Sequence, residues 1–590
     1  MNIAVAMLLS IAGLTIGFFT WGKYVARRSG VNPNLPTPAV RINDGVDYVP
    51  AKPIVLLGHH YASIAAAGPI IGPTLALIYG FIPAWLWLLF GVIFIGAVHD
   101  FSALFVSVRE NGRSIAHIAK KTLGNTGFAL FLSFAILLIM LVNAAFLQLT
   151  AIALTSTYPI SKLGLPPDQT LLKTTIVKGE IYGKIGGIAS TSVIIITIFA
   201  PLVGYLLYKK HIKTYIASLI ALSIVLISVI IGLKFPVSLN PQIWMVIILI
   251  YSFIASWIPV WVILQPRDFT NVHFLYIGLA TMVLGIIGSG LAGIKIQAPT
   301  FNIDSLSMEA LGPIWPFLFV TIACGAVSGA HSLIATGTTS KQISNEKYTH
   351  LIGYGAMLLE SLLGMSVLLV ILSAVDFEHY KELVWPIENG HLKQGNAPLA
   401  FAVSVGKTLN NGLGIPIFFG TIFGILMLEG FLITTIDTLF RLMRYFFEEL
   451  WNVLFVKKPA ILESRMFNAL LAIILTAILS FTNGYQKIWP IFGSANQLLA
   501  ALTLVAVTAW FAQKSIKAYF AAIPAGFMII TTMASLSILL KKYIESKNLT
   551  LTITDILLLS LASGVIVLTF KYFFKLRAEL SKQKFVEQMK

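Results

Sequence analysis

Apolar runs of about 20 residues, the length needed to cross a ~30 Å hydrocarbon core, recur along this whole sequence. Of the 590 residues, 57% are hydrophobic and 11% are charged, so no segment remains for a sizeable soluble domain. Backbone polar groups must find internal partners in lipid, and helices provide them. The sequence therefore predicts an all-α polytopic membrane protein.

We expect fifteen transmembrane spans. They lie at 2–22, 53–79, 84–106, 126–155, 190–208, 214–233, 242–264, 272–294, 315–338, 351–374, 414–440, 466–483, 489–511, 519–540 and 553–573. The first span has no basic segment before it and no small-residue cleavage site, so it is expected to be retained rather than removed as a signal peptide.

The distribution of positive charge predicts the orientation. Basic residues follow the first span instead of preceding it, which places the N-terminus outside and the C-terminus in the cytoplasm. Every arginine and most lysines then fall on the cytoplasmic side. The net charge of +17 is spread over short loops between apolar runs, so it does not indicate a nucleic-acid-binding protein. The lone Cys324 provides neither a disulfide nor a cysteine metal site.

The second span is expected to be a broken helix. Three glycines and two prolines (Gly58, Gly68, Gly72, Pro69 and Pro73) remove helical hydrogen bonds near its middle. Unpaired backbone groups at membrane depth are tolerated only where they face protein or a watery cavity. Broken helices hold substrates and ions in many secondary transporters, so this segment is a candidate binding site.

Similar interruptions are expected in the seventh, ninth and eleventh spans, at 256–268, 324–341 and 429–437. The second and seventh spans run in opposite directions, which predicts two inverted five-helix repeats. We therefore divide the chain into an extra helix and cytoplasmic connector (1–52), a first repeat (53–240), a second, inverted repeat (241–445), and accessory helices with a basic tail (446–590).

Several of these stretches resemble the carbon starvation protein (CstA) family of inner-membrane transporters. The resemblance lies in Gly58–Ala62, Gly68–Pro73, Gly96–Phe101, Arg109–Ser114, Pro259–Trp261 with Gln265–Asp268, Ala323–Gly329 with Ser340 and Lys341, Thr434–Thr438 with Arg441, and Trp489–Leu498. It implies proton-coupled uptake of peptides or pyruvate during starvation. It also implies a distant relation to the amino acid–polyamine–organocation superfamily and its LeuT-like inverted repeat.

The predicted substrate-binding residues lie at the breaks. They are Gly58, His59, His60, Gly68, Pro69, Gly72, Trp257, Pro259, Trp261, Gly325 and Ser328. Each has a purely structural alternative: small residues permit close packing of membrane helices, and a histidine or tryptophan can simply be packed and hydrogen-bonded within the bundle.

The predicted ion-coupling residues are Asp437, Glu429, Ser332, Thr338, Thr339 and His331, with Glu360 as a secondary candidate. A buried Asp437 could take up a proton, or it could form a static ion pair with Arg441 one turn later. The hydroxyls could bind Na⁺ or make interhelical hydrogen bonds. Asp100 is expected to pair with a loop arginine, Arg109 or Arg113. No cofactor is expected, and H⁺ is favoured over Na⁺ as the coupling ion.

The sequence thus predicts a secondary active transporter, not an enzyme, that imports a small carboxylate-bearing substrate, pyruvate or a short peptide. One alternative is an intramembrane metal-dependent enzyme that uses His59, His60, His99 and Asp100. Others are a transporter-like nutrient sensor and a simple channel. No Walker-type phosphate-binding motif is present to support ATP-driven pumping. Asn496 and Gln497 fall outside the predicted ten-helix core and receive no role.

Overall fold

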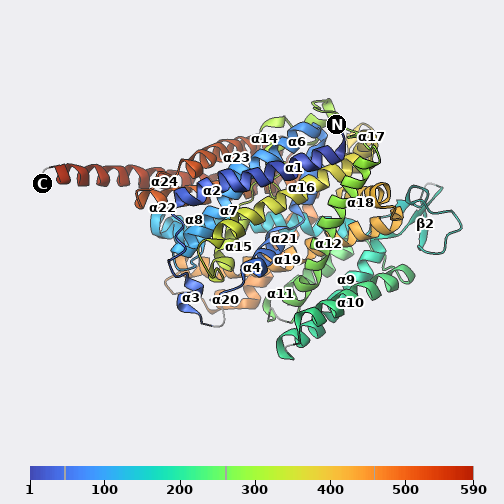
Figure 1. Ribbon diagram of the computed structural model, residues 1–590, viewed down its shortest axis with the longest axis horizontal. Helices are drawn as coiled ribbons and strands as arrows, with labels where there is room; N and C mark the ends of the chain where they lie inside the picture. The colour runs from blue at the N-terminus through green and yellow to red at the C-terminus, as the bar shows by residue number, and fades with distance from the viewer. Residues whose placement is uncertain (45–47, 178, 211, 260–261, 458, 589–590) are drawn as a thin grey trace.

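The computed structural model describes residues 1–590 except 45–47, 178, 211, 260–261, 458 and 589–590 (Figure 1). The helices of the first half are α1 (Ile3–Gly17), α2 (Lys23–Ser29), α3 (Pro38–Ile42), α4 (Pro53–Ile64), α5 (Gly68–Ala76), α6 (Phe81–Leu86), α7 (Ala97–Arg109), α8 (Ile115–Leu154), α9 (Ile185–Gly204), α10 (Thr214–Lys234), α11 (Pro241–Trp257) and α12 (Leu264–Leu291). A π-helical segment, Trp87–Gly96, joins α6 to α7.

The helices of the second half are α13 (Ser305–Ala310), α14 (Ile314–Thr321), α15 (Ala330–Gly337), α16 (Gly355–Ala374), α17 (Phe377–Val384), α18 (Ala397–Leu413), α19 (Ile417–Leu454), α20 (Ala460–Glu463), α21 (Arg465–Thr482), α22 (Tyr485–Gln513), α23 (Tyr519–Glu545) and α24 (Leu549–Gln588). Strands β1 (Tyr158–Pro159), β2 (Thr174–Val177) and β3 (Glu180–Gly183) form a sheet of order β1-β3-β2, and β4 (Ile387–Glu388) pairs with β5 (His391–Leu392).

Within the described part of the chain, twelve helices are long and apolar enough to cross a membrane, or thirteen if the bent pair α4–α5 counts as one span. The all-α membrane class is confirmed, but fifteen full spans are not. The predicted span 242–264 is the shorter helix α11, and the predicted span 315–338 consists of the two short helices α14 and α15.

Contacts between loops follow the predicted alternation of sides. Asn2 forms a β-bridge with Lys295, and Tyr158 contacts His379 at 3.0 Å, all in segments predicted to lie outside. In segments predicted to lie inside, Arg109 pairs with Glu346 at 2.7 Å. Figure 1 shows β2, α17 and the N-terminus at one end of the bundle, and the C-terminal part of α24 extending beyond the opposite end.

The predicted break in the second span is confirmed. Helix α4 ends at Ile64 and α5 begins at Gly68, and the two axes differ by 51°. Pro69 has no N–H, which suits the first turn of α5. The ninth span is broken more widely, because residues 322–329 between α14 and α15 are not helical.

The expected interruptions of the seventh and eleventh spans are wrong. Pro259 follows the end of α11 at Trp257, so it lies in a connection to α12 and interrupts no helix. Helix α19 runs without a break through Glu429, Gly430 and Asp437. Asp437 pairs with Arg267 of a neighbouring helix and Thr435 donates to the Phe431 carbonyl of its own helix, so these polar side chains do not need an unwound backbone.

The most deeply buried spans are those that contain α8, α16, α19 and α22, since most of their residues are buried. Helix α8 packs against both α19 and α22, and α16 packs against α5 and α18. The α9–α10 hairpin and α24 are much less buried, and Figure 1 shows α10 at the edge of the bundle. The two broken helices are therefore held within a densely packed core.

Candidate substrate and coupling site

The two broken helices meet at their breaks. A Cβ atom added to Gly68 would overlap Cys324, and one added to Gly72 would lie 2.8 Å from the carbonyl oxygen of Thr321. A Cβ at Gly325 would contact Pro69 at 3.6 Å. Because real side chains almost never approach a backbone atom to 2.8 Å, Gly72 must be glycine for α5 to approach residues 321–325 this closely.

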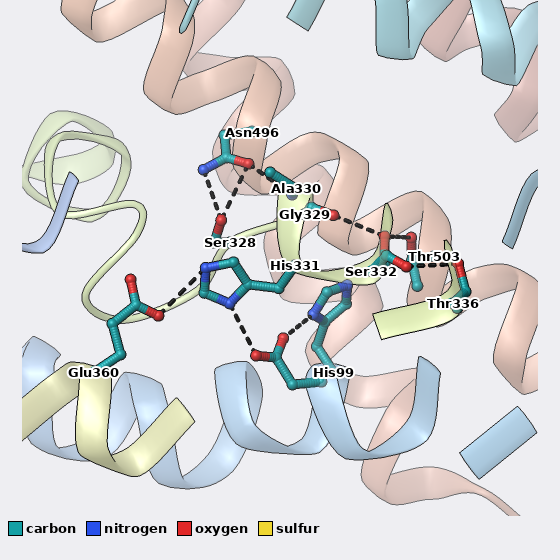
Figure 2. A network of polar contacts seen from close by, with 11 residues as sticks. His99, Ser328, Gly329, Ala330, His331, Ser332, Thr336, Glu360, Asn496 and Thr503 are labelled. Atoms are coloured by element: carbon teal, nitrogen blue, oxygen red, sulfur yellow. Dashed lines mark hydrogen bonds and ion pairs between the residues drawn. The ribbon is translucent and has the colours of Figure 1, made fainter. Parts of the chain in front are cut away.

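Helix α22 supports the unwound segment 322–329. Asn496 accepts a hydrogen bond from the backbone N–H of Ala330 at 3.0 Å through its side chain, and one from that of Gly329 at 3.0 Å through its backbone carbonyl. Its amide group also donates to Ser328 at 3.0 Å (Figure 2). The Gln497 amide donates to the Phe319 carbonyl at 2.7 Å. These bonds give partners to backbone groups that the break leaves without helical ones.

Asn496 and Gln497 are thus site residues that sequence reasoning missed. Apart from lying in the resembling stretch Trp489–Leu498, they are marked in the sequence by forming a polar pair within the largely apolar span 489–511. Such a pair has many possible partners in a fifteen-span chain. Only the packing of α22 against α14 and α15 selects the break as the partner.

A chain of four titratable side chains lies beside the break (Figure 2). His99 and Asp100 come from α7, His331 from α15 and Glu360 from α16. The contacts are 2.7 Å from His99 Nδ1 to Asp100 Oδ1, 2.8 Å from His331 Nδ1 to Asp100 Oδ2, and 3.3 Å from His331 Nε2 to Glu360 Oε2. The expected pairing of Asp100 with Arg109 or Arg113 is wrong, because two imidazoles occupy both of its oxygens.

Several buried polar atoms around the breaks have no hydrogen-bond partner in the described part of the chain. They include Tyr61 Oη, His60 Nε2, His99 Nε2 and both carboxylate oxygens of Glu360. Burying a polar group without a partner costs free energy, so such groups are rare unless they serve a function. Several of them near one pair of helix breaks indicate a site for a polar ligand.

The two predicted histidines of α4 lie in different environments. His59 is exposed, whereas His60 is buried with Nδ1 2.9 Å from the hydroxyl of Thr339. Gly58 lies against Tyr276 of α12, where an added Cβ would overlap the phenol oxygen. Of the two predicted coupling threonines, Thr339 therefore contacts His60. Thr338 is exposed, and its hydroxyl donates to the Ile334 carbonyl.

The remaining predicted residues are spread more widely. Ser332 donates to the Gly329 carbonyl at 2.7 Å and contacts Thr503 at 3.2 Å, which places it at the break (Figure 2). Trp257 is exposed at the end of α11, and Pro259 follows it. Trp261 lies outside the described residues. The structure does not bring Trp257 to the breaks of α4–α5 and α14–α15.

Asp437 lies in a second polar cluster. Its Oδ2 accepts from Arg267 Nη1 at 3.0 Å and from the Tyr251 hydroxyl at 2.7 Å. Arg441, the expected partner, instead donates to the backbone carbonyls of Ala255 and Ile258 at the end of α11. The static ion pair therefore exists, but with Arg267. The charged run Gln265–Asp268, at the edge of an apolar span, was its only sequence signal.

Glu429, one of the predicted coupling residues, is fully buried in α19. Neither of its carboxylate oxygens has a partner in the described part of the chain. The structure does not place it in the chain of side chains from His99 to Glu360.

No group of three or more His, Cys, Asp and Glu side chains among the described residues is arranged to hold a metal ion. His59 and His60 point to different environments, and Asp100 is already shared by two imidazoles. The four residues of the metal-enzyme alternative therefore do not form a metal centre in this structure.

Together, the spanning helices and the two facing breaks define a multi-pass membrane protein with a polar site at the interrupted helices. The chain matches the family described as "Carbon starvation protein CstA" over residues 2–389 and 387–535, and it belongs to that family. It is therefore a CstA-family membrane transporter.

Its relatives include the peptide transporter CstA of Escherichia coli, which is 30% identical over 89% of this chain and 79% of that protein. Another is the pyruvate/proton symporter BtsT of Escherichia coli, which is 29% identical over 90% of this chain and 80% of that protein. These relatives are transporters, not enzymes. A solved structure of a mutant manganese transporter from Eremococcus coleocola covers 93% of this chain and 99% of its own, with 12% identity and a TM-score of 0.39.

Proposed function

We propose that this chain is a secondary active transporter of the cytoplasmic membrane that imports a short peptide or pyruvate together with protons. The observation that carries the proposal is the meeting of two broken helices around buried polar atoms without partners. The names of the relatives supply the two substrate classes. A proton is favoured over Na⁺ because titratable groups, His331, Asp100 and Glu360, line the breaks.

The start of α5 is the proposed site for the substrate carboxylate. Helix N-termini carry a partial positive charge, and no side chain caps α5. The start of α15 is less suitable for the carboxylate, because its backbone N–H at Ala330 already donates to the Asn496 side chain. Tyr61, whose hydroxyl has no partner in the described chain, would add a hydrogen-bond donor.

An inverted repeat of the LeuT type is also part of the proposal, with changed boundaries. The packing of α5 on α16 has a counterpart in α15 on α7, that of α8 on α22 in α19 on α12, and that of α8 on α11 in α19 on α21. These pairs favour units that begin at the broken helices α4–α5 and α14–α15, with the α9–α10 hairpin as an insertion. Rocking of one unit against the other would alternate access. The N-terminus would lie outside and the C-terminus in the cytoplasm.

The test uses purified protein in liposomes that contain a trapped pH dye. Outside pyruvate or a dipeptide should acidify the lumen beyond the leak of protein-free liposomes. Tyr61→Phe should raise the half-saturating substrate concentration about 2–10-fold, the factor that corresponds to the free energy of one neutral hydrogen bond. Tyr543→Phe is the matched control, since its hydroxyl bonds to the Lys487 carbonyl in the accessory helices. If neither substrate moves protons and neither labelled substrate enters, the proposal is wrong.

A further inference from the structure

The chain of side chains from His99 to Glu360 joins three elements, α7, α15 and α16. All four side chains are nearly inaccessible, with at most 3% of any of them exposed. Figure 2 shows His331 between the two carboxylates, on the helix that follows the unwound segment. The contacts therefore connect the broken helix to α7 on one side and to α16 on the other.

Asp100 determines which nitrogen of His331 carries a hydrogen. A carboxylate only accepts hydrogen bonds, and both oxygens of Asp100 face imidazole Nδ1 atoms. Both imidazoles therefore carry a hydrogen at Nδ1. When His331 is neutral, its Nε2 presents a lone pair, and that atom is the one that faces Glu360.

His331 Nε2 and Glu360 Oε2 lie at ion-pair distance without forming an aligned hydrogen bond, and their close approach is favourable only when one more proton is present. Either an imidazolium donates to a carboxylate, or a protonated Glu360 donates to a neutral imidazole. Without that proton, a lone pair and a negative carboxylate would face each other across 3.3 Å in a buried site. Gain or loss of a single proton thus makes or breaks the connection between α15 and α16.

We propose that His331 and Glu360 share the proton that the transporter carries, and that this proton fastens α15 to α16. Asp100 is a positioning residue that orients His331. This inference rests on the proposed function. Release of the proton would free the start of α15. There the backbone N–H of Ala330 donates to Asn496, and the unwound segment 322–329 before it contacts α5. Proton binding and the arrangement of the broken helix would thereby be linked.

Other groups near this pair do not supply a competing positive charge. His60 of α4 interacts electrostatically with Asp100 and His331, while Tyr61 and Cys324 interact with Glu360. No lysine or arginine is among the groups in contact with the four residues in the described part of the chain. The number of charges at the site therefore changes when the shared proton leaves.

The other buried acid predicted to couple, Asp437, lies in a different electrostatic setting. Its partner Arg267 stays protonated at all physiological pH values, so the pair holds a fixed charge. Protonation of Asp437 would remove the carboxylate that contacts the buried guanidinium, leaving Asp268 and Glu429 as the other acids that interact with Arg267. The geometry therefore assigns proton coupling to His331 and Glu360 rather than to Asp437.

The test separates proton-driven accumulation from substrate binding and movement. In proteoliposomes, one symported proton and a gradient of two pH units can drive up to about 100-fold accumulation of substrate. Glu360→Gln should abolish this accumulation, because its amide N–H replaces the exchangeable proton toward His331 Nε2. The same variant should retain counterflow, the exchange of labelled for unlabelled substrate without a gradient. Glu360→Asp should restore part of the accumulation.

Three further variants complete the design. His331→Gln should also lose accumulation, and it provides a second test if Glu360→Gln is poorly folded. Asp100→Asn should keep accumulation but shift its pH profile, as expected of a positioning residue. Asp555→Asn, which neutralises a buried carboxylate in the accessory helix α24, should behave as wild type.

Each outcome decides the question. Accumulation by both Glu360→Gln and His331→Gln at the wild-type level would overturn the inference and leave the proposed function standing. Loss of accumulation in Asp437→Asn alone would move the coupling site to Asp437. Absence of accumulation in the wild-type protein would mean that the proposed function itself has failed.

Discussion

The buried pair between Asp437 and Arg267 allows a quantitative prediction. Asp437 is fully buried, 2% of the Arg267 side chain is exposed, and the two lie 3.0 Å apart. Tyr251 contacts both, at 2.7 Å from Asp437 and 2.5 Å from Arg267. Asp437→Ala would remove the carboxylate in contact with the guanidinium, and breaking a buried pair in this way costs about 3–5 kcal/mol.

Asp437→Asn should be milder. The asparagine carbonyl can still accept a hydrogen bond from Arg267, so the loss is the charge-assisted part, about 1.5–3 kcal/mol. Since about 1.4 kcal/mol corresponds to a factor of ten, the alanine variant should inactivate on the order of 10²–10⁴-fold faster if the pair is broken in the transition state for unfolding. The asparagine variant should inactivate about 10–100-fold faster.

The assay is the rate at which detergent-solubilised protein leaves the monodisperse fraction at one fixed temperature. A rate is appropriate because a chain of many spans does not unfold in two states. Asp555→Ala is the control, since Asp555 is buried and has no partner in the described chain. The double variant Arg267→Met with Asp437→Leu should be much closer to wild type than either single change. Strictly additive effects of the two single changes would refute a direct interaction between these side chains.

Two other predictions concern the helix break and an outer helix. Gly72→Ala should reduce uptake and cost about 1–3 kcal/mol of stability, because the new Cβ would lie 2.8 Å from the Thr321 carbonyl; an unchanged transport rate and thermal stability would contradict the close approach of α5. At the start of α17, the backbone N–H of His379 donates to Asp376 and lowers the pKa of that carboxyl. The capping stabilisation should be complete above the ordinary aspartate pKa of about 3.9 and be lost as the pH falls through the lower folded-state value. Hydrogen exchange of α17 should show this loss in wild type but not in Asp376→Asn, and a pH-independent α17 in wild type would contradict it.

Most of the spans, their order and the break in the second span could be predicted from the sequence, because they depend on local properties. Apolar length and the absence of backbone donors at proline act within about twenty residues. The break in the seventh span was mispredicted for the same reason. Pro259 carries the same local signal as Pro69, but the chain there turns from α11 into α12, and only the three-dimensional path distinguishes a helix end from a helix break.

The partners of the polar residues were decided by the tertiary structure. His99, Asp100, His331 and Glu360 lie on three elements separated by up to about 260 positions, and no spacing rule relates them. Asp437 could be identified from the sequence as a buried acid, but the guanidinium that neutralises it lies 170 residues away, on another helix. A membrane sequence determines which residues are buried through the cost of exposing them to lipid. Which of them share a proton, a charge or a backbone carbonyl depends on how the helices pack, and that arrangement exists only in the folded bundle.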